Sequence, residues 1–357
     1  MISSESSLRL NLLRFPLIVG VVFIHASATK VGFSGGEVGL SQPVFIVDFV
    51  RNFISSIAAV SVPTFFLMSG YLFFVKFSWS KQSYIAKLKT RVKTLLIPFL
   101  FWNTVTFIIV AIAQAIPATR VFFSGNRAPI SSFTSIFDYL DMLIGITGLP
   151  IAYQFWFIRD LMILVLLVPF LSIIIRFLPL PFIGVMLACW LTDTWTLYVP
   201  SSVAVLFFSI GAYLSSIKED LFCSDKFGPG ILPLYLSVVT VDVLSMNQSP
   251  IPYLYKIGLL LGVLSVLFST KLISRNQEVK SLILKLSSAS FFVYAIHEPL
   301  LIILKKILYR IFSPDSPFAT LFIYFSLPLI IIGVAIVAHG FILRISPRFA
   351  TLITGGR

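Results

Sequence analysis

Apolar runs long enough to cross a lipid bilayer recur from the first dozen residues of this 357-residue chain to the last. A helix needs about 20 mostly apolar residues to cross the hydrocarbon core of a membrane. The chain is 58% hydrophobic and only 11% charged, whereas a soluble domain has about 25% charged residues. The runs do not alternate polar and apolar residues as barrel strands do. We therefore predict an all-α fold, a polytopic helical bundle in a membrane.

About ten transmembrane helices are predicted, and no polar stretch between them is long enough to form a second domain. We therefore expect a single membrane domain over residues 1–357. A weaker amphipathic stretch at 133–148 is expected to lie at the membrane interface or to re-enter the membrane. The predicted spans cover residues 9–29, 46–75, 93–116, 155–176, 182–198, 201–217, 229–246, 253–273, 286–310 and 318–344.

The positions of lysine and arginine predict the orientation, because cytoplasmic loops carry an excess of these residues. With the N-terminus in the cytoplasm, 18 of the 27 lysines and arginines fall on the inner side, which leaves nine on the outer side. Both termini are then cytoplasmic. The net charge of +13 is mostly a sign of this topology, and the expected partner is the lipid bilayer. Nucleic acid is not an expected partner, because the aromatic residues lie inside apolar runs.

The residue types that bind metals best are few and scattered. Cys189 and Cys223 are single cysteines in different surroundings, and we expect both to be free thiols. The three histidines, His25, His297 and His339, fall in separate predicted spans. A structural or catalytic zinc site would need ligands at close, regular spacing. The sequence therefore predicts no metal site.

Two polar residues stand in the first predicted span. Arg14 and His25 are eleven residues apart, so both side chains project from one helical face, about 16 Å apart along the axis. An ionisable group inside a span is costly unless it faces the interior of the bundle, which makes each a candidate functional residue. The alternative is an arginine that reaches the inner interface and a histidine that lies at the outer one.

The ninth predicted span carries a second polar stripe. Ser290, Tyr294 and His297 recur at spacings of four and three residues, which places them on one helical face. Glu298 and Pro299 follow directly. A proline here removes a backbone hydrogen bond, and the freed carbonyl group lies one turn back in the helix. The stripe is either a functional site around His297 or a set of hydrogen bonds between helices.

The start of the fourth predicted span is also polar. Trp156 and Arg159 are candidates for substrate binding, and the alternative for Arg159 is a structural ion pair with Asp160. Asp193 and Asp242 lie in apolar runs without an obvious partner, and no role is assigned to either residue.

A basic loop at 76–93 separates the second and third predicted spans. It has six basic residues in eighteen, and three of them, Lys89, Arg91 and Lys93, lie where the third span begins. Such a loop can simply obey the topology rule and contact anionic lipid. It would equally suit a phosphate-rich cytosolic ligand, because lysine and arginine bind phosphate oxygens by charge-assisted hydrogen bonds.

Taken together and in order, these features resemble the acyltransferase 3 family of bacterial integral-membrane O-acyltransferases. The resemblance covers nearly the whole chain. Each motif alone is weak, but six of them in this order across ten spans are specific. The motifs are Arg14 with His25, Val62 to Leu72, Arg91 with Leu95 to Pro98, Phe155 to Ile158, Phe208 to Leu214, and Ser290 to His297.

The resemblance implies transfer of an acyl group, usually acetyl from acetyl-coenzyme A, to a hydroxyl of a cell-surface or exopolysaccharide glycan or its lipid-linked precursor. It implies a multi-pass protein of the bacterial cytoplasmic (inner) membrane, with an acyl-CoA donor, a glycan acceptor and room for a protein partner. Many members have a basic residue three positions after the equivalent of Arg91, where this chain has Thr94. Some members have an extracytoplasmic hydrolase-like domain, which we do not expect here.

Roles for the polar residues follow from the resemblance. His25 is the candidate base, or the residue that carries the acyl group, and Arg14 would hold the donor phosphates or orient the thioester. Arg91, with Lys89 and Lys93, would bind the phosphates of the donor. His297 is a second candidate for activating the acceptor, and Tyr294 or Ser290 would fix its tautomer.

The rival hypothesis is a transporter or flippase of a lipid-linked saccharide, which would share the buried polar residues and the basic inner loops. The inverted repeat that many transporters carry is not visible in this sequence. The ordered motifs favour the acyltransferase.

Overall fold

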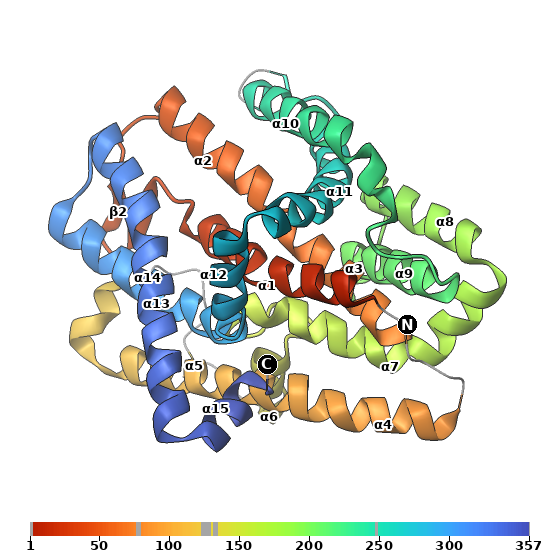
Figure 1. Ribbon diagram of the computed structural model, residues 1–357. Helices are drawn as coiled ribbons and strands as arrows, with labels where there is room; N and C mark the ends of the chain where they lie inside the picture. The colour runs from red at the N-terminus through yellow and green to blue at the C-terminus, as the bar shows by residue number, and fades with distance from the viewer. Residues whose placement is uncertain (1–2, 76–79, 123–129, 131–134, 247–248, 357) are drawn as a thin grey trace.

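The computed structural model describes residues 3–75, 80–122, 130, 135–246 and 249–356, and over these residues it is helical apart from one short hairpin (Figure 1). Lys76 and Phe133, which belong to the predicted basic loop and amphipathic stretch, lie outside this description. In chain order the elements are α1 (Ser4–Ala26), β1 (Lys30–Phe33), β2 (Gly36–Gly39), α2 (Phe45–Ala58), α3 (Ser61–Phe74), α4 (Lys81–Arg91), the π-helical turn η1 (Val92–Leu96), α5 (Ile97–Ala115), the 3₁₀ turn η2 (Pro117–Phe122), α6 (Ile136–Ile144), the 3₁₀ turn η4 (Tyr153–Phe155), α7 (Trp156–Phe177), α8 (Pro179–Thr192), α9 (Ser202–Ser216), the 3₁₀ turn η5 (Cys223–Phe227), α10 (Gly228–Ser245), α11 (Leu254–Arg275), α12 (Gln277–Ser287), α13 (Ser290–Phe312), α14 (Pro317–Ile345) and α15 (Pro347–Thr354).

The first helix is the centre of the bundle. α1 packs against α2, α3, α11, α12, α13 and α14, and Figure 1 shows these helices around it. Its residues Leu12 and Val22 are fully buried although they lie ten residues apart. A helix enclosed on most sides can hold polar groups away from lipid, which is what Arg14 and His25 require.

Seven helical stretches among the described residues are long and apolar enough to cross a membrane. α8 and α9 are apolar but shorter. α13 has 23 residues and carries Glu298, Lys305, Lys306 and Arg310 along its length. Each of the ten predicted spans includes helical residues, and the prediction of a polytopic helical bundle is confirmed.

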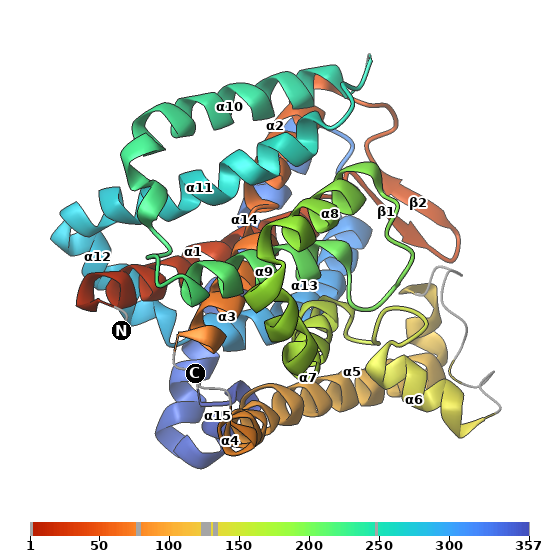
Figure 2. The ribbon, with the colours of Figure 1, turned by 90° about the vertical axis from the view of Figure 1, so that its right-hand side faces the viewer.

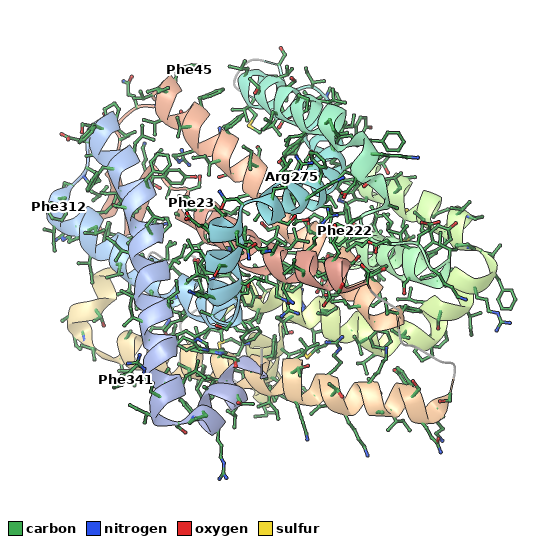
Figure 3. All side chains as sticks on the ribbon, in the orientation of Figure 1. Phe23, Phe45, Phe222, Arg275, Phe312 and Phe341 are labelled. Atoms are coloured by element: carbon green, nitrogen blue, oxygen red, sulfur yellow. The ribbon has the colours of Figure 1, made fainter. Side chains whose placement is uncertain are left out.

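The outer surface of the bundle is apolar. Phe45, Phe312 and Phe341 are exposed and stand at the periphery (Figure 3). In α6, Ile136 and Phe137 are also exposed, and this helix falls inside the predicted amphipathic stretch. Large apolar side chains over so much of a surface are expected where lipid is the solvent.

The structure differs from the sequence prediction in the following respects. The second span is two helices, because the chain turns at residues 59–60 between α2 and α3. The fifth span ends at Thr192, where Asp193 takes a left-handed backbone conformation with φ of 55°. Lys256 closes this end, since its ammonium group donates to the carbonyl oxygens of Trp190 and Leu191 at 2.8 and 3.0 Å and pairs with Asp193 at 2.6 Å. Third, an antiparallel hairpin pairs Lys30–Phe33 with Gly36–Gly39.

Two helices approach closely at glycines. Gly70 of α3 lies against the backbone of α9 at Phe208, and Gly211 of α9 lies against α3 at Leu67. A Cβ atom at either glycine would overlap the facing carbonyl oxygen. Small residues allow helix backbones to meet in this way in membrane bundles. The contact fixes the position of α3, whose residues form one wall of the cavity described below.

The two ends of the bundle carry different elements. Figure 2 shows the N-terminus and α12 at one end, and β1, β2 and α6 at the other. Arg9 in the first turns of α1 pairs with Asp225 of η5 at 2.6 Å, so η5 belongs to the N-terminal end. This grouping agrees with the sidedness that the lysine and arginine positions predict.

We expect reporter fusions at Lys81, Lys226 and Arg275 to give a cytoplasmic signal, and a fusion at Gly35 to give an external one. The physical reason is the excess of basic residues in the loops at the N-terminal end of the bundle. The measurement is a paired alkaline phosphatase and fluorescent protein fusion at each position. An external signal at Lys81 with a cytoplasmic signal at Gly35 would invert the proposed orientation.

Candidate active site

Most of the predicted site residues line one cavity between the helices. Its volume is about 240 Å³, and its walls come from α1, α3, the end of α4, the beginning of α7 and the α12–α13 junction. Arg14 and His25 both line it, as expected if they share one face of α1. The predicted site residues that line this cavity are Arg14, His25, Arg91, Trp156, Ser290 and Tyr294.

The basic side chains at one end of the cavity lack partners. Neither Arg14 nor Arg91 forms a hydrogen bond or an ion pair with any residue that the structure describes. Lys89 and Lys93 are exposed and do not line the cavity. An unpaired guanidinium group inside the bundle is costly, and an anionic ligand would offset that cost. Arg91 is therefore the member of the basic loop that the structure places at the cavity.

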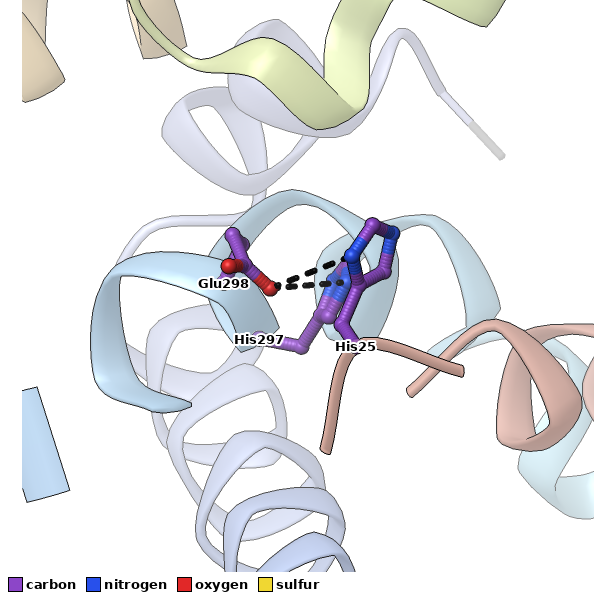
Figure 4. A group of neighbouring side chains, drawn as sticks. All are labelled: His25, His297 and Glu298. Atoms are coloured by element: carbon purple, nitrogen blue, oxygen red, sulfur yellow. Dashed lines mark ion pairs between the residues drawn. The ribbon is translucent and has the colours of Figure 1, made fainter. Parts of the chain in front are cut away.

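His25 lies at the other end of the cavity, within a cluster of polar side chains. Its Nδ1 atom is 3.0 Å from the Tyr153 hydroxyl, and this hydroxyl also donates a short hydrogen bond to Glu298. The Glu298 carboxylate lies 3.7 Å from His25 Nδ1 and 3.9 Å from His297 Nε2 (Figure 4). Lys305 donates to the His25 carbonyl oxygen at 2.9 Å. Residues from α1, η4 and α13 thus converge on one point.

His297 packs against His25 on the side away from the cavity. It is fully buried, and its ring centroid lies 5.3 Å from that of His25. Its Nδ1 atom is 2.7 Å from the Tyr294 carbonyl oxygen, which can only accept, so Nδ1 carries the proton. The backbone carbonyl group of Tyr294 therefore fixes this tautomer. His297 does not line the cavity.

The carbonyl group freed by Pro299 has a new partner. Pro299 cannot donate to the Ala295 carbonyl oxygen four residues back, and Gln154 Nε2 donates to that oxygen at 3.2 Å. The Tyr294 hydroxyl in turn donates to the Gln154 carbonyl oxygen at 2.6 Å. These two bonds tie the segment before α7 to the middle of α13, and they hold Tyr153 beside His25.

The remaining predicted residues divide into two groups. The Ser290 hydroxyl and the Trp156 indole N–H make no hydrogen bond with the described residues, and both residues line the cavity. Arg159 lies elsewhere. Its guanidinium group donates to the carbonyl oxygens of Gly145 and Gly148 and pairs with Asp160 at 3.1 Å. This arrangement favours the structural alternative for Arg159, in which it anchors the loop before α7.

A second cavity of about 370 Å³ begins where the first one ends. Gln154 lines both, and Tyr153 and Glu298 line the second. Its walls are mostly aliphatic side chains of α5 and α13, with Lys306 as a further charged residue. The cluster around His25 therefore lies between the two cavities.

Three side chains of this cluster have a spacing that could suit a metal ion. Ligand atoms of His25, His297 and Glu298 all lie within 4.8 Å of one another. The sequence did not predict this proximity, because the histidines are in different helices. Two of these residues already share the Tyr153 hydroxyl. The predicted absence of a metal stays a prediction.

Sequence reasoning missed Tyr153 and Glu298. Glu298 carried a usable signal, since a carboxylate inside a span is costly and marks a functional residue. Tyr153 carried none, because it precedes the predicted fourth span. It comes within reach of His25 only through the fold, since the two residues are 128 positions apart.

The fold and the site together define a multi-pass membrane protein whose buried polar groups converge on one cavity. The chain belongs to the family described as acyltransferase domain, whose model matches residues 7–339.

A curated relative extends this likeness over the whole chain. The protein is 26% identical to the succinoglycan biosynthesis protein ExoH of Rhizobium meliloti (strain 1021), over 98% of this chain and 92% of the relative. No solved structure matches the chain.

Proposed function

We propose that this protein is an O-acyltransferase that moves acetyl from acetyl-coenzyme A to a hydroxyl of a cell-surface or exopolysaccharide glycan, or of its lipid-linked precursor. The observation that carries the proposal is one cavity with two unpaired arginines at one end and His25 at the other. Membership of an acyltransferase family supports acyl transfer. The relative named for succinoglycan biosynthesis supports a glycan acceptor. We place the protein in the bacterial inner membrane, with the arginines on the cytoplasmic side.

The cavity suits the long arm of coenzyme A. Arg14 and His25 are about 16 Å apart along α1, and the pantetheine arm separates the phosphates of coenzyme A from its thioester in a similar way. At about 240 Å³, the cavity is smaller than sites that enclose a whole drug-sized ligand, which occupy about 300–1,000 Å³. We therefore propose that the arm enters the cavity while the nucleotide stays outside, with its phosphates against Arg91 and Arg14.

The proposed chemistry needs a base beside the thioester. His25 takes the proton from the acceptor hydroxyl, the hydroxyl oxygen attacks the thioester carbonyl carbon, and the carbon–sulfur bond breaks. The same proton then passes from His25 to the departing thiolate, so that the imidazole is neutral again. In the alternative route, His25 itself carries the acyl group before the acceptor takes it.

The purified protein should consume acetyl-coenzyme A and release free coenzyme A, slowly alone and faster with an acceptor glycan. A flippase of a lipid-linked saccharide has no reason to cleave a thioester, so this measurement separates the two hypotheses. Thiol release can be followed with a chromogenic disulfide, and transfer with a labelled acetyl group. Saccharide movement across vesicles without any thioester cleavage would favour the flippase.

A matched set of variants tests whether the donor binds at the cavity. Arg91→Gln should raise KM for acetyl-coenzyme A several-fold, because a phosphate contact is lost. Lys89→Gln and Lys93→Gln, next to it but exposed, should change KM much less. Equal changes in KM at all three positions would mean that the basic loop acts only through its overall positive charge.

A further inference from the structure

The hydroxyl of Tyr153 stands between a histidine and a carboxylate. It donates a short hydrogen bond to Glu298 Oε1, and it lies 3.0 Å from His25 Nδ1. Glu298 is almost fully buried, with 3% of its surface exposed. Tyr153 and Glu298 also border the second cavity, on the far side of His25 from the arginines.

A tyrosine hydroxyl has a single proton, and this fixes the direction of the hydrogen bonds. An ionised carboxylate can only accept, so the Tyr153 proton points to Glu298. The Tyr153 oxygen must then accept from His25, which places a proton on His25 Nδ1. The other ring nitrogen, Nε2, consequently keeps its lone pair. The protonation state of Glu298 thus decides which nitrogen of His25 is basic.

Neighbouring groups hold this arrangement in place. The backbone on both sides of Tyr153 is fixed, since Ala152 N donates to Asn103 Oδ1 at 3.2 Å and Gln154 bonds to Ala295 and Tyr294. Lys305 lies two turns beyond Glu298 on the same helix and bonds to the His25 carbonyl oxygen at 2.9 Å. Lys305 and Glu298 thus lie on the same face of α13.

We propose that Tyr153 and Glu298 are positioning residues that keep His25 in the Nδ1-protonated tautomer and spread the positive charge that forms on it. The inference rests on the proposed function of His25 as the base. When Nε2 takes the proton of the acceptor hydroxyl, the Nδ1 proton moves toward the Tyr153 oxygen and the Tyr153 proton toward Glu298. Both protons return when Nε2 passes its own proton to the departing thiolate.

Tyr153→Phe and Glu298→Gln should each lower kcat for acyl transfer by about 10- to 100-fold, with KM for acetyl-coenzyme A unchanged. Both replacements keep the shape of the side chain, so thermal stability should stay close to wild type. The double variant should be little worse than the worse single variant, because the two residues act through one chain of hydrogen bonds. Two unrelated structural roles would instead give effects that multiply.

The matched control is Tyr309→Phe. Tyr309 is almost fully buried, and its hydroxyl donates to the Ala28 carbonyl oxygen at 3.0 Å, away from His25 and Glu298. This variant should keep the wild-type kcat.

Three outcomes would overturn the proposal that Tyr153 and Glu298 position His25. The first is wild-type kcat in Tyr153→Phe while His25→Ala is inactive, which leaves the proposed function intact. The second is a change in KM alone, which would assign Tyr153 to donor binding. The third is loss of activity with a chelator and recovery with zinc, which would assign His25, His297 and Glu298 to a metal. Absence of acyl transfer by the wild-type protein would instead refute the proposed function itself.

Discussion

His25→Ala should lower acyl transfer by at least about 10²-fold while expression, membrane insertion and donor binding stay near wild type. A general base contributes roughly 10²–10⁴ to a rate, and a direct acyl carrier would contribute at least as much. The arginines that we propose bind the donor lie at the other end of the cavity, so affinity for coenzyme A should not change. The measurement is acetylation of the native glycan in cells that lack the wild-type gene, together with coenzyme A binding by the purified variant.

Two other histidines serve as controls for this prediction. His339 is buried beside Phe292, with ring centroids 5.5 Å apart, and does not line the cavity, so His339→Ala should leave activity nearly unchanged. His297→Ala should fall between the two, because a supporting residue costs less than a lost base. A thermal-shift measurement on each variant separates chemistry from unfolding. If His25→Ala keeps most of its activity, the base lies elsewhere and His297 is the next candidate. If it loses activity only because it unfolds, the residue is structural.

Gly211→Ala should destabilise the bundle by roughly 1–3 kcal/mol or more, and Gly70→Ala should do the same. The new methyl group at either position would overlap a carbonyl oxygen of the facing helix, so α3 and α9 would have to separate. Separation moves the α3 wall of the cavity, and we therefore expect activity to fall together with stability. The measurement is the thermal unfolding of the purified variants in one detergent, with acyl transfer measured on the same samples.

Glycines in open surroundings provide the control. A Cβ atom added at Gly184 of α8 or at Gly333 of α14 would meet no heavy atom within 4 Å. Alanine favours a helix over glycine by about 1 kcal/mol, so these variants should be as stable as wild type or slightly more so. Equal losses at all four positions would mean that the tight contact between α3 and α9 is not what makes Gly70 and Gly211 necessary.

Much of the fold could be predicted because each span is a local pattern. Long apolar runs give helices whatever lies beside them, and each predicted span includes helical residues. The differences come from contacts that are remote in the sequence. α8 ends at Thr192 because Lys256, more than sixty residues later, bonds to its last carbonyl groups. The hairpin at 30–39 is too short for a periodic pattern to show.

The candidate site divides in the same way. Arg14 and His25 belong to one helix, so their shared face follows from helical geometry alone. The carbonyl group freed by Pro299 was also predictable, since the effect is confined to one turn. The hydrogen bonds of Tyr153 to His25 and Glu298 cross 128 and 145 residues, and only the assembled bundle brings these side chains together. Arg159 was predicted as a candidate for substrate binding, but it bonds to the loop before α7. A charged residue at the boundary of a span can anchor a loop as easily as it can bind a ligand, and the sequence does not distinguish the two roles.

The shortness of α8 has a consequence for the surrounding lipid. Its 14 residues span about 21 Å, against a hydrocarbon thickness of about 30 Å. Leu180 and Val185 are exposed on this helix, so lipid tails contact it directly. If α8 crosses the membrane, the tails beside it have to shorten to keep the turn after Thr192 at the membrane surface, at a cost of fractions of a kcal/mol per Å of mismatch. We therefore expect the bilayer to be thinner beside α8, and membranes of short-chain lipid to accommodate the protein with the least strain.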